Sequence, residues 1–223
     1  MVKRMQKGFW ERPALKKRRS ASHPVVVMYA QSKLNLIFQK IDYRTVNSIL
    51  DVGCGNGFFT LPLYQKFRNI IGLDFSSLML SLIKNNKISL LKADTLFLPF
   101  KDYSFDIVFS SNLLHHVDSI SKSIREMRRV SKKYIIIIEA NRRNLLMHLF
   151  SKLKKEENDD KFFSLENLTA KILQENILII DTFSTGFITP NRTPYILTPF
   201  LKKLNIQKNR FGFYNIVIGL LRD

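Results

Sequence analysis

Three glycines at alternate positions follow a short apolar run in the segment ILDVGCGNGFF, residues 49–59. Gly53, Gly55 and Gly57 permit positive φ angles and let the backbone approach a ligand without an intervening Cβ atom. An ATP-binding loop is excluded, because no lysine follows Gly57. A dinucleotide-binding loop fits poorly, because the third glycine comes one residue early and Asp51 precedes the first. A carboxylate there would repel a pyrophosphate and suits a cationic ligand.

Alternating elements must position this loop. The predicted strands, rich in Ile, Leu, Val and Phe, are residues 48–52, 70–74, 88–94, 105–111, 134–140, 177–185 and 212–221. The predicted helices are residues 22–41, 57–67, 76–86, 119–130, 141–155, 164–176 and 193–204. Apolar strands separated by helices predict an α/β protein with a mostly parallel sheet covered on both faces. Ligands of such sheets bind at the carboxyl ends of the strands, where the glycines lie.

The spacing Asp-Val-Gly-Cys-Gly-Asn-Gly closely resembles motif I of the class I S-adenosylmethionine (SAM)-dependent methyltransferases. Three further segments match later motifs of this family in order: Asp74 ends the second predicted strand, Ala93 and Asp94 end the third, and residues 98–117 cover the fourth. The resemblance extends over residues 29–140 and is to the type-11, ubiquinone/menaquinone-biosynthesis-like group. It implies a Rossmann-like, doubly wound sheet of seven strands with an antiparallel last strand. It also implies SAM as cofactor, S-adenosylhomocysteine as product and no metal ion.

The resemblance implies roles for particular side chains. Asp51 would receive the amino group of SAM, directly or through water, Asp74 would accept both ribose hydroxyls, and Asp94 would accept the adenine amine. Phe75 and Met79 would cover the adenine ring. Each also has a structural interpretation, with Asp74 as a helix cap, Asp94 as a turn former, and Phe75 and Met79 as core residues. The predicted cofactor-binding residues are Tyr29, Asp51, Gly53, Cys54, Gly55, Gly57, Asp74, Phe75, Met79, Ala93, Asp94, Thr95, Ser110 and Ser111.

Two histidines after the fourth predicted strand are the candidate catalytic residues. A hydroxyl or acidic carbon acceptor needs a general base, and His116 is preferred over His115 for that role. The alternative is that the pair is structural or only neighbours the cofactor. Residues 110–113 lack the Asn/Asp-Pro-Pro-aromatic motif of enzymes that methylate exocyclic base amines. Cys54, the single cysteine, lies in the glycine loop, which argues against a cysteine-adduct route to 5-methylcytosine. Ribose hydroxyl methylation stays open.

The charge is strongly basic, with 36 Lys and Arg against 18 Asp and Glu, a formal net charge of +18. This favours a polyanionic partner, either nucleic acid or an anionic membrane surface; a lysine-rich background is the alternative. We divide the chain into a basic tail, residues 1–21, and one methyltransferase domain, residues 22–223, in which residues 141–210 form a variable acceptor side. The basic amphipathic helix predicted at 141–155 suits a lid or a membrane-surface contact.

A single cysteine excludes a disulfide framework, and no Cys/His cluster has zinc spacing. No apolar run is long enough to cross a bilayer, so we expect a cytoplasmic protein. The leading hypothesis is methyl transfer from SAM to a small-molecule or lipid-like acceptor, by O- or C-methylation. One alternative is an RNA methyltransferase that uses the basic N-terminal arm. Another is a SAM-binding protein without turnover. The oligomeric state is left open.

Overall fold

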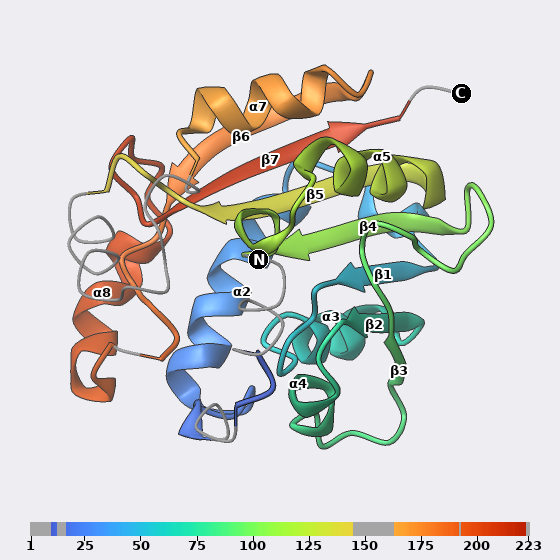
Figure 1. Cartoon of the computed structure of the whole chain (residues 1–223). Coiled ribbons are helices and arrows are strands. Elements are labelled where there is room, and N and C mark those ends of the chain that lie inside the picture. The colour runs from blue at the N-terminus through green and yellow to red at the C-terminus, as the bar shows by residue number, and fades with distance from the viewer. Residues whose placement is uncertain (1–9, 13–16, 145–162, 192, 222–223) are drawn as a thin grey trace.

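A single seven-stranded sheet organises the protein in a computed structural model that describes residues 10–12, 17–144, 163–191 and 193–221 (Figure 1). The strand order is β3-β2-β1-β4-β5-β7-β6. The strands are β1 (Ile49–Val52), β2 (Ile70–Asp74), β3 (Ser89–Lys92), β4 (Phe105–Ser111), β5 (Ser131–Ala140), β6 (Leu178–Thr185) and β7 (Tyr214–Leu220). Strands β1 to β5 pair in parallel, and β7 runs antiparallel to both β5 and β6. The predicted fold class is confirmed.

Helices cover both faces of the sheet (Figure 1). The α-helices are α2 (Pro24–Phe38), α3 (Thr60–Phe67), α4 (Ser77–Ser81), α5 (Ile120–Val130), α7 (Leu165–Leu173) and α8 (Thr198–Asn205), and the short 3-10 helices are η2 (Tyr43–Thr45), η3 (Leu114–His116) and η5 (Tyr195–Leu197). Alternate residues of β5 point to opposite faces: Ile136 and Ile138 pack in the core under α2 and α3, and Ile135 and Ile137 in the core under α5 and α7. This two-sided burial explains why the strands have continuous apolar sequences.

Helix α2 begins where the sequence predicts. Pro24 occupies its first turn, and the His23 side chain caps the helix by accepting a hydrogen bond from the backbone N–H of Val25. The helix places Tyr29 in the core, with 1% of its surface exposed. The first helix therefore contributes a buried phenol beside the sheet.

One predicted helix begins differently. Asn141 makes a parallel bridge with Phe163, and its side-chain oxygen accepts the backbone N–H of Arg143, so residues 141–144 form a bridge and a turn. Asn favours this arrangement because its short polar side chain bonds the backbone two residues later. The prediction that a helix opens at Asn141 is therefore wrong. The rest of that predicted helix, residues 145–155, lies outside the described residues.

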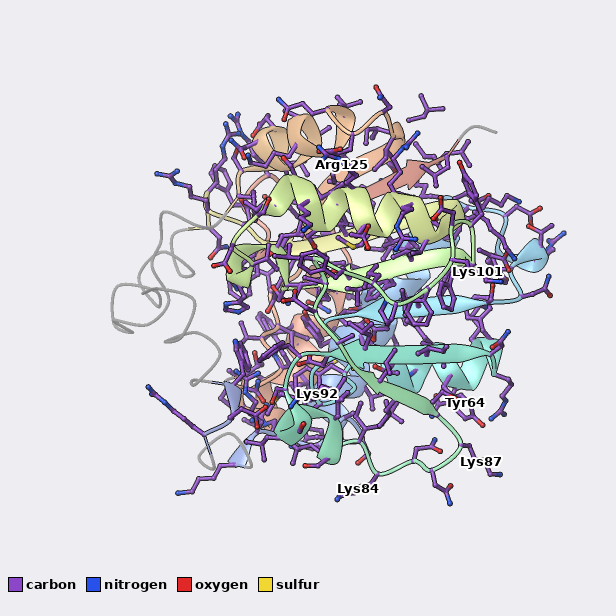
Figure 2. The ribbon with its side chains drawn as sticks, turned by 45° about the vertical axis from the view of Figure 1, so that its right-hand side comes forward. Tyr64, Lys84, Lys87, Lys92, Lys101 and Arg125 are labelled. Carbon is purple, nitrogen blue, oxygen red and sulfur yellow. The ribbon has the colours of Figure 1, made fainter. Side chains whose placement is uncertain are left out.

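Within the described residues, no helix is long and apolar enough to cross a membrane. Exposed basic side chains come from several separate elements and loops, as Figure 2 shows for Lys84, Lys87, Lys92, Lys101 and Arg125. The division of the chain at residue 21 stays a prediction.

Candidate functional site

The glycine loop connects the carboxyl end of β1 to α3. The backbone N–H groups of Gly53 and Cys54 both donate to the carbonyl of Leu73 on β2, at 2.7 and 2.9 Å, which holds the loop against the neighbouring strand. All three glycines have positive φ angles, +73°, +54° and +86° in chain order. A Cβ atom on Gly53 would lie 2.8 Å from a leucine side chain, whereas one on Gly55 would meet nothing within 4 Å. Gly53 is therefore required for packing, and Gly55 borders open space that a ligand can enter.

Asp74 links the glycine loop to the end of β2. One carboxylate oxygen accepts the backbone N–H of Gly55 at 2.8 Å, and the other accepts that of Ser76 at 2.8 Å. Burial raises the pKa of Asp74, and the nearby carboxylate of Glu11 raises it further, against the opposing effect of these hydrogen bonds. Asp74 thus stabilises the turn that leads into α4, whereas the cap of that helix is Ser76, whose hydroxyl accepts the backbone N–H of Met79. The role of Asp74 toward ribose stays a prediction.

Asp51 is buried below the loop, with 2% of its surface exposed. Its carboxylate accepts a hydrogen bond of 2.7 Å from the hydroxyl of Thr60 at the start of α3. Burial raises the pKa of Asp51 to about 7, with a further contribution from the charge of Asp74. A cationic group brought close to Asp51 would reverse this shift, because an opposite charge favours the ionised form. Cys54 is buried beside it, and burial raises the pKa of that thiol well above its usual value.

The predicted adenine-binding residues lie at the carboxyl ends of β2 and β3. A carboxylate oxygen of Asp94 accepts the backbone N–H of Leu96 at 3.0 Å, as expected of a turn former. The Thr95 hydroxyl is buried and lies 2.8 Å from a serine hydroxyl of α5. Met79 is 1% exposed and belongs to the core, whereas Phe75 is 37% exposed. Of this predicted pair, Phe75 has the accessible ring.

The end of β4 brings several predicted residues together. Asn112, at a φ of 53°, donates from its amide to the Tyr29 hydroxyl at 3.5 Å and to the Ser111 hydroxyl at 3.2 Å. The hydroxyl oxygen of Ser110 is buried and has no hydrogen-bond partner among the described residues. Burial raises the pKa of Tyr29 to about 12, so its phenol stays protonated. This end of the strand therefore presents neutral hydroxyl and amide groups.

A buried carboxylate on β5 fixes the histidine segment. Glu139 is fully buried, and one of its oxygens accepts the backbone N–H groups of Leu113 and Leu114 at 2.9 and 2.6 Å. Its other oxygen lies 2.6 Å from Nδ1 of His115. The His116 ring lies against that of His115, with ring centroids 3.9 Å apart. Sequence reasoning missed Glu139, although a lone acid inside the apolar run YIIIIEA is an available signal.

The N-terminal segment contacts the site at the turn between β2 and α4. The backbone carbonyl of Trp10 accepts a hydrogen bond of 2.7 Å from the Ser76 hydroxyl, and the Glu11 carboxylate accepts the backbone N–H of Ser77 at 3.0 Å. The Trp10 ring makes an edge contact with His116, with centroids 5.0 Å apart. The sequence predicted a tail here and did not predict that Trp10 would lie beside the candidate base.

The same segment continues over the glycine loop. The Arg18 guanidinium lies 4.8 Å from the centre of the Trp10 ring. The Arg19 carbonyl accepts a hydrogen bond of 3.1 Å from the Asn56 side chain, and the Arg19 guanidinium donates to the backbone carbonyls of Pro190 and Thr193. These contacts connect the glycine loop to the segment that follows β6.

The polar groups around the glycine loop fit SAM. The ligand is a zwitterionic nucleoside with an ammonium, a carboxylate and a ribose but no phosphate. The site offers a buried carboxylate at Asp51, a partly buried one at Asp74 and open space at Gly55. Among the described residues, no group of three or more His, Cys, Asp or Glu side chains could hold a metal ion.

The fold and the site define the class of protein: a Rossmann-like class I methyltransferase domain. Residues 50–137 match the family described as a methyltransferase domain, methyltransferase type 11. A solved SAM-dependent methyltransferase of Thermotoga maritima has the same fold, with a TM-score of 0.68 at 22% identity over 89% of this chain and 91% of that one.

Curated relatives agree with this class. The chain is 32% identical, over 67% of its length, to malonyl-[acyl-carrier protein] O-methyltransferase of Buchnera aphidicola, and spans 65% of the length of that relative. It is 28% identical, over 82% of its length, to demethylmenaquinone methyltransferase of Lactobacillus johnsonii, of which it spans 75%. The family model over residues 50–137 and these relatives confirm the predicted similarity to the type-11 group of class I SAM-dependent methyltransferases and the predicted cofactor class.

Proposed function

We propose that this protein transfers a methyl group from SAM to a small-molecule or lipid-like acceptor, by O- or C-methylation. The observation that supports this proposal most directly is the arrangement around Gly55, which borders open space, is bonded to the partly buried carboxylate of Asp74 and follows the buried Asp51 of β1. Asp74 already accepts the N–H of Gly55, so the loop and the acid form one unit before any ligand binds. Such preorganisation lowers the conformational cost of binding.

Different residues would contact different parts of the cofactor. Asp51 would stabilise the ammonium group, Asp74 the ribose hydroxyls and Phe75 one face of the adenine. SAM supplies, when bound, a methyl group activated by a sulfonium, so the protein's task is mainly to align the acceptor and exclude water. Trp10 is placed to help exclude water, because its backbone and ring contact both Ser76 and His116.

We propose His116 as the general base and His115 as its positioning residue. Nδ1 of His115 is engaged by Glu139 at 2.6 Å, so that ring is fixed by a buried hydrogen bond. The His116 ring packs on it and faces Trp10 instead. A proton taken from an acceptor hydroxyl or acidic carbon would therefore be held on His116. Tyr29, whose pKa is raised to about 12, would take no part in proton transfer at neutral pH.

The acceptor class follows from the relatives by analogy. Their names specify a malonyl group on a carrier protein in one case and a demethylated menaquinone in the other. Neither is a nucleic acid, which favours the small-molecule or lipid-like acceptor over RNA. Contact with a membrane surface and a cytoplasmic location stay predictions.

Incubating the protein with methyl-labelled SAM and a cell extract tests the proposal. The lipid, small-molecule, RNA and protein fractions are then separated, and we expect the label in a lipid or small-molecule fraction. Asp74→Ala should abolish transfer, and Asp102→Ala is the matched control, because Asp102 is a 62% exposed acid in a surface ion pair with Arg129. Label in RNA would favour the RNA hypothesis instead. Binding of S-adenosylhomocysteine without transfer to any fraction would favour the non-catalytic one.

A further inference from the structure

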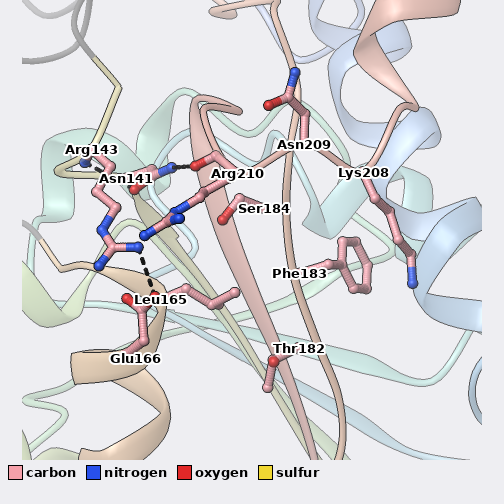
Figure 3. Close-up of a pocket in the computed structure, with 10 residues that line it drawn as sticks. All are labelled: Asn141, Arg143, Leu165, Glu166, Thr182, Phe183, Ser184, Lys208, Asn209 and Arg210. Atoms are coloured by element: carbon pink, nitrogen blue, oxygen red, sulfur yellow. Dashed lines mark hydrogen bonds and ion pairs between the residues drawn. The ribbon is translucent and has the colours of Figure 1, made fainter.

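A pocket lies beside the edge strand β6 (Figure 3). It has a volume of about 370 Å³ and is lined by Asn141, Arg143, Leu165, Glu166, Thr182, Phe183, Ser184, Lys208, Asn209 and Arg210. None of these residues belongs to the predicted cofactor-binding set.

This pocket opens at the same edge of the sheet as the cofactor site. Strands β5 and β6 are both antiparallel to β7, so they run parallel to each other and their carboxyl ends lie together. Asn141 directly follows β5, and Ser184 is the next-to-last residue of β6. In the strand order, β6 is three steps from β4. At about 4.8 Å per step, the pocket lies roughly 14 Å along this edge from the proposed transfer site.

The lining is cationic. It contains three basic side chains, Arg143, Lys208 and Arg210, and one carboxylate, Glu166. The Lys208 ammonium lies 3.0 Å from Asp181, and Asp181 also pairs with Lys40 at 3.2 Å. These three side chains together therefore carry one net positive charge. Arg143 and Arg210 add two positive charges and Glu166 adds one negative charge. Together with the Lys208 group, the surroundings of the pocket therefore carry a net charge of about +2.

Two further features favour an anion in this pocket. The Asn141 amide donates to the carbonyls of Arg210 and Gly212, at 3.1 and 2.8 Å, and so fixes the loop that presents Arg210. The pocket also contains the first turn of α7, a helix of nine residues capped by Ser164, and the helix dipole favours an anion at that end. In Figure 3 the Arg210 and Arg143 side chains converge on the space above Glu166.

The internal ion pair at this pocket can exchange for a ligand. Arg143 and Glu166 lie 2.7 Å apart, but their side chains are 37% and 62% exposed. Exposed pairs of this kind contribute little to stability, since water solvates both partners when they separate. An arriving anion with more charge than Glu166 would therefore compete well for Arg143.

We propose that this pocket binds a phosphate monoester group, and that this group is part of the methyl acceptor. A phosphate monoester is close to a dianion at pH 7, which matches a net charge of about +2 better than a carboxylate does. The assignment to the acceptor rests on the proposed function, because it depends on the shared sheet edge. The acceptor would then have its phosphate roughly 14 Å from its methylated atom.

Titration with methyl phosphate tests the pocket directly. We expect saturable binding at pH 7.5 and low salt, about 10-fold weaker for Arg143→Ala and for Arg210→Ala, and tighter for Glu166→Gln. Arg125→Ala is the matched control, because Arg125 is an exposed arginine that pairs with Glu175, just beyond the far end of α7 (Figure 2). Undetectable binding to the wild type, or equal weakening by Arg125→Ala, would overturn the proposal. Binding of S-adenosylhomocysteine should be unchanged in every variant, which shows that the fold is intact.

A second experiment tests the link to the acceptor. The labelled transfer is repeated with an extract fraction treated with phosphatase, and we expect transfer to fall strongly. Arg210→Ala should raise the KM for the untreated fraction and leave kcat nearly unchanged. Full transfer after phosphatase treatment would overturn the assignment to the acceptor, while methyl phosphate binding would still identify the pocket. Loss of the proposed function would instead appear as failure to bind S-adenosylhomocysteine.

Discussion

We expect Asp51 to make cofactor affinity depend on pH. Its carboxyl is 2% exposed, and burial raises its pKa to about 7 in the unligated protein. The proposed partner is an ammonium group, which pairs with the carboxylate and gains nothing from the protonated acid. Affinity for S-adenosylhomocysteine, which has the same amino group, should therefore rise with pH as Asp51 ionises.

The size of this effect follows from the pKa. With a value near 7, roughly 1% of Asp51 is ionised at pH 5 and roughly 90% at pH 8. The apparent dissociation constant is the intrinsic constant divided by the competent fraction, so binding should be roughly 90-fold weaker at pH 5, or about 3 kcal/mol. Binding at pH 6 should release about 0.9 protons.

The same shift predicts the stability of the unligated protein. The folded pKa of about 7 lies above the ordinary value of 3.8, so the folded state retains the proton that the unfolded state loses. The contribution of Asp51 is fully present below pH 3.8 and is lost as the pH rises to about 7. Over this window the free energy of unfolding should fall by about 4 kcal/mol relative to Asp51→Asn.

Isothermal titration of S-adenosylhomocysteine between pH 5 and 8, in two buffers of different ionisation enthalpy, measures both affinity and proton release. Asp51→Asn should bind with nearly constant affinity over this range, because its amide oxygen can still accept the Thr60 hydroxyl but does not titrate. Asp94→Asn is the control and should retain the pH dependence of the wild type. A wild-type affinity that is constant with pH, or an unchanged slope in Asp51→Asn, would refute the reasoning.

Four further substitutions have defined outcomes. Gly53→Ala should lower the free energy of unfolding by about 1–3 kcal/mol in denaturant titration, because the φ is +73° and the new Cβ would lie 2.8 Å from a leucine side chain. Gly55→Ala should mainly weaken S-adenosylhomocysteine binding and affect stability less. A larger loss of stability in Gly55→Ala than in Gly53→Ala would contradict these roles. Glu139→Gln should lower kcat and shift the pH–rate profile, since the charged partner of His115 at 2.6 Å is lost; an unchanged profile would argue against a positioning role. Lys33→Met should stabilise the protein at pH 7, because burial lowers the pKa of Lys33 well below 10.5. The stability contributed by Lys33 is complete only above pH 10.5 and is lost as the pH falls. The free energy of unfolding of the wild type should therefore rise between pH 7 and 9.5 relative to that of Lys33→Met. The same change of unfolding free energy with pH in both proteins would exclude the effect.

Much of the fold was predictable because its determinants are local. The predicted bounds of β2 and β4 agree with the structure, since continuous apolar runs between polar or turn residues define them. Strand β5 begins at Ser131, three residues before the prediction, because Ser131 pairs with Phe105 despite its polar sequence. The turn at residues 141–144 replaced a predicted helix because Asn141 bonds to its own turn and to distant carbonyls. Periodicity does not record such contacts.

The sequence by itself determined the methyl-donor side of this protein. Asp51, the three glycines and Asp74 lie within about 25 residues, and their types and spacing follow from the backbone conformation and charge that the loop needs. The tertiary structure decided what surrounds it: Glu139 beside His115, Trp10 beside His116, and Arg143 near Arg210. These partners are 24, 106 and 67 positions apart in the chain. Only the folding of the sheet brings them together, because side-chain chemistry between distant segments leaves no periodic or local signal in the sequence.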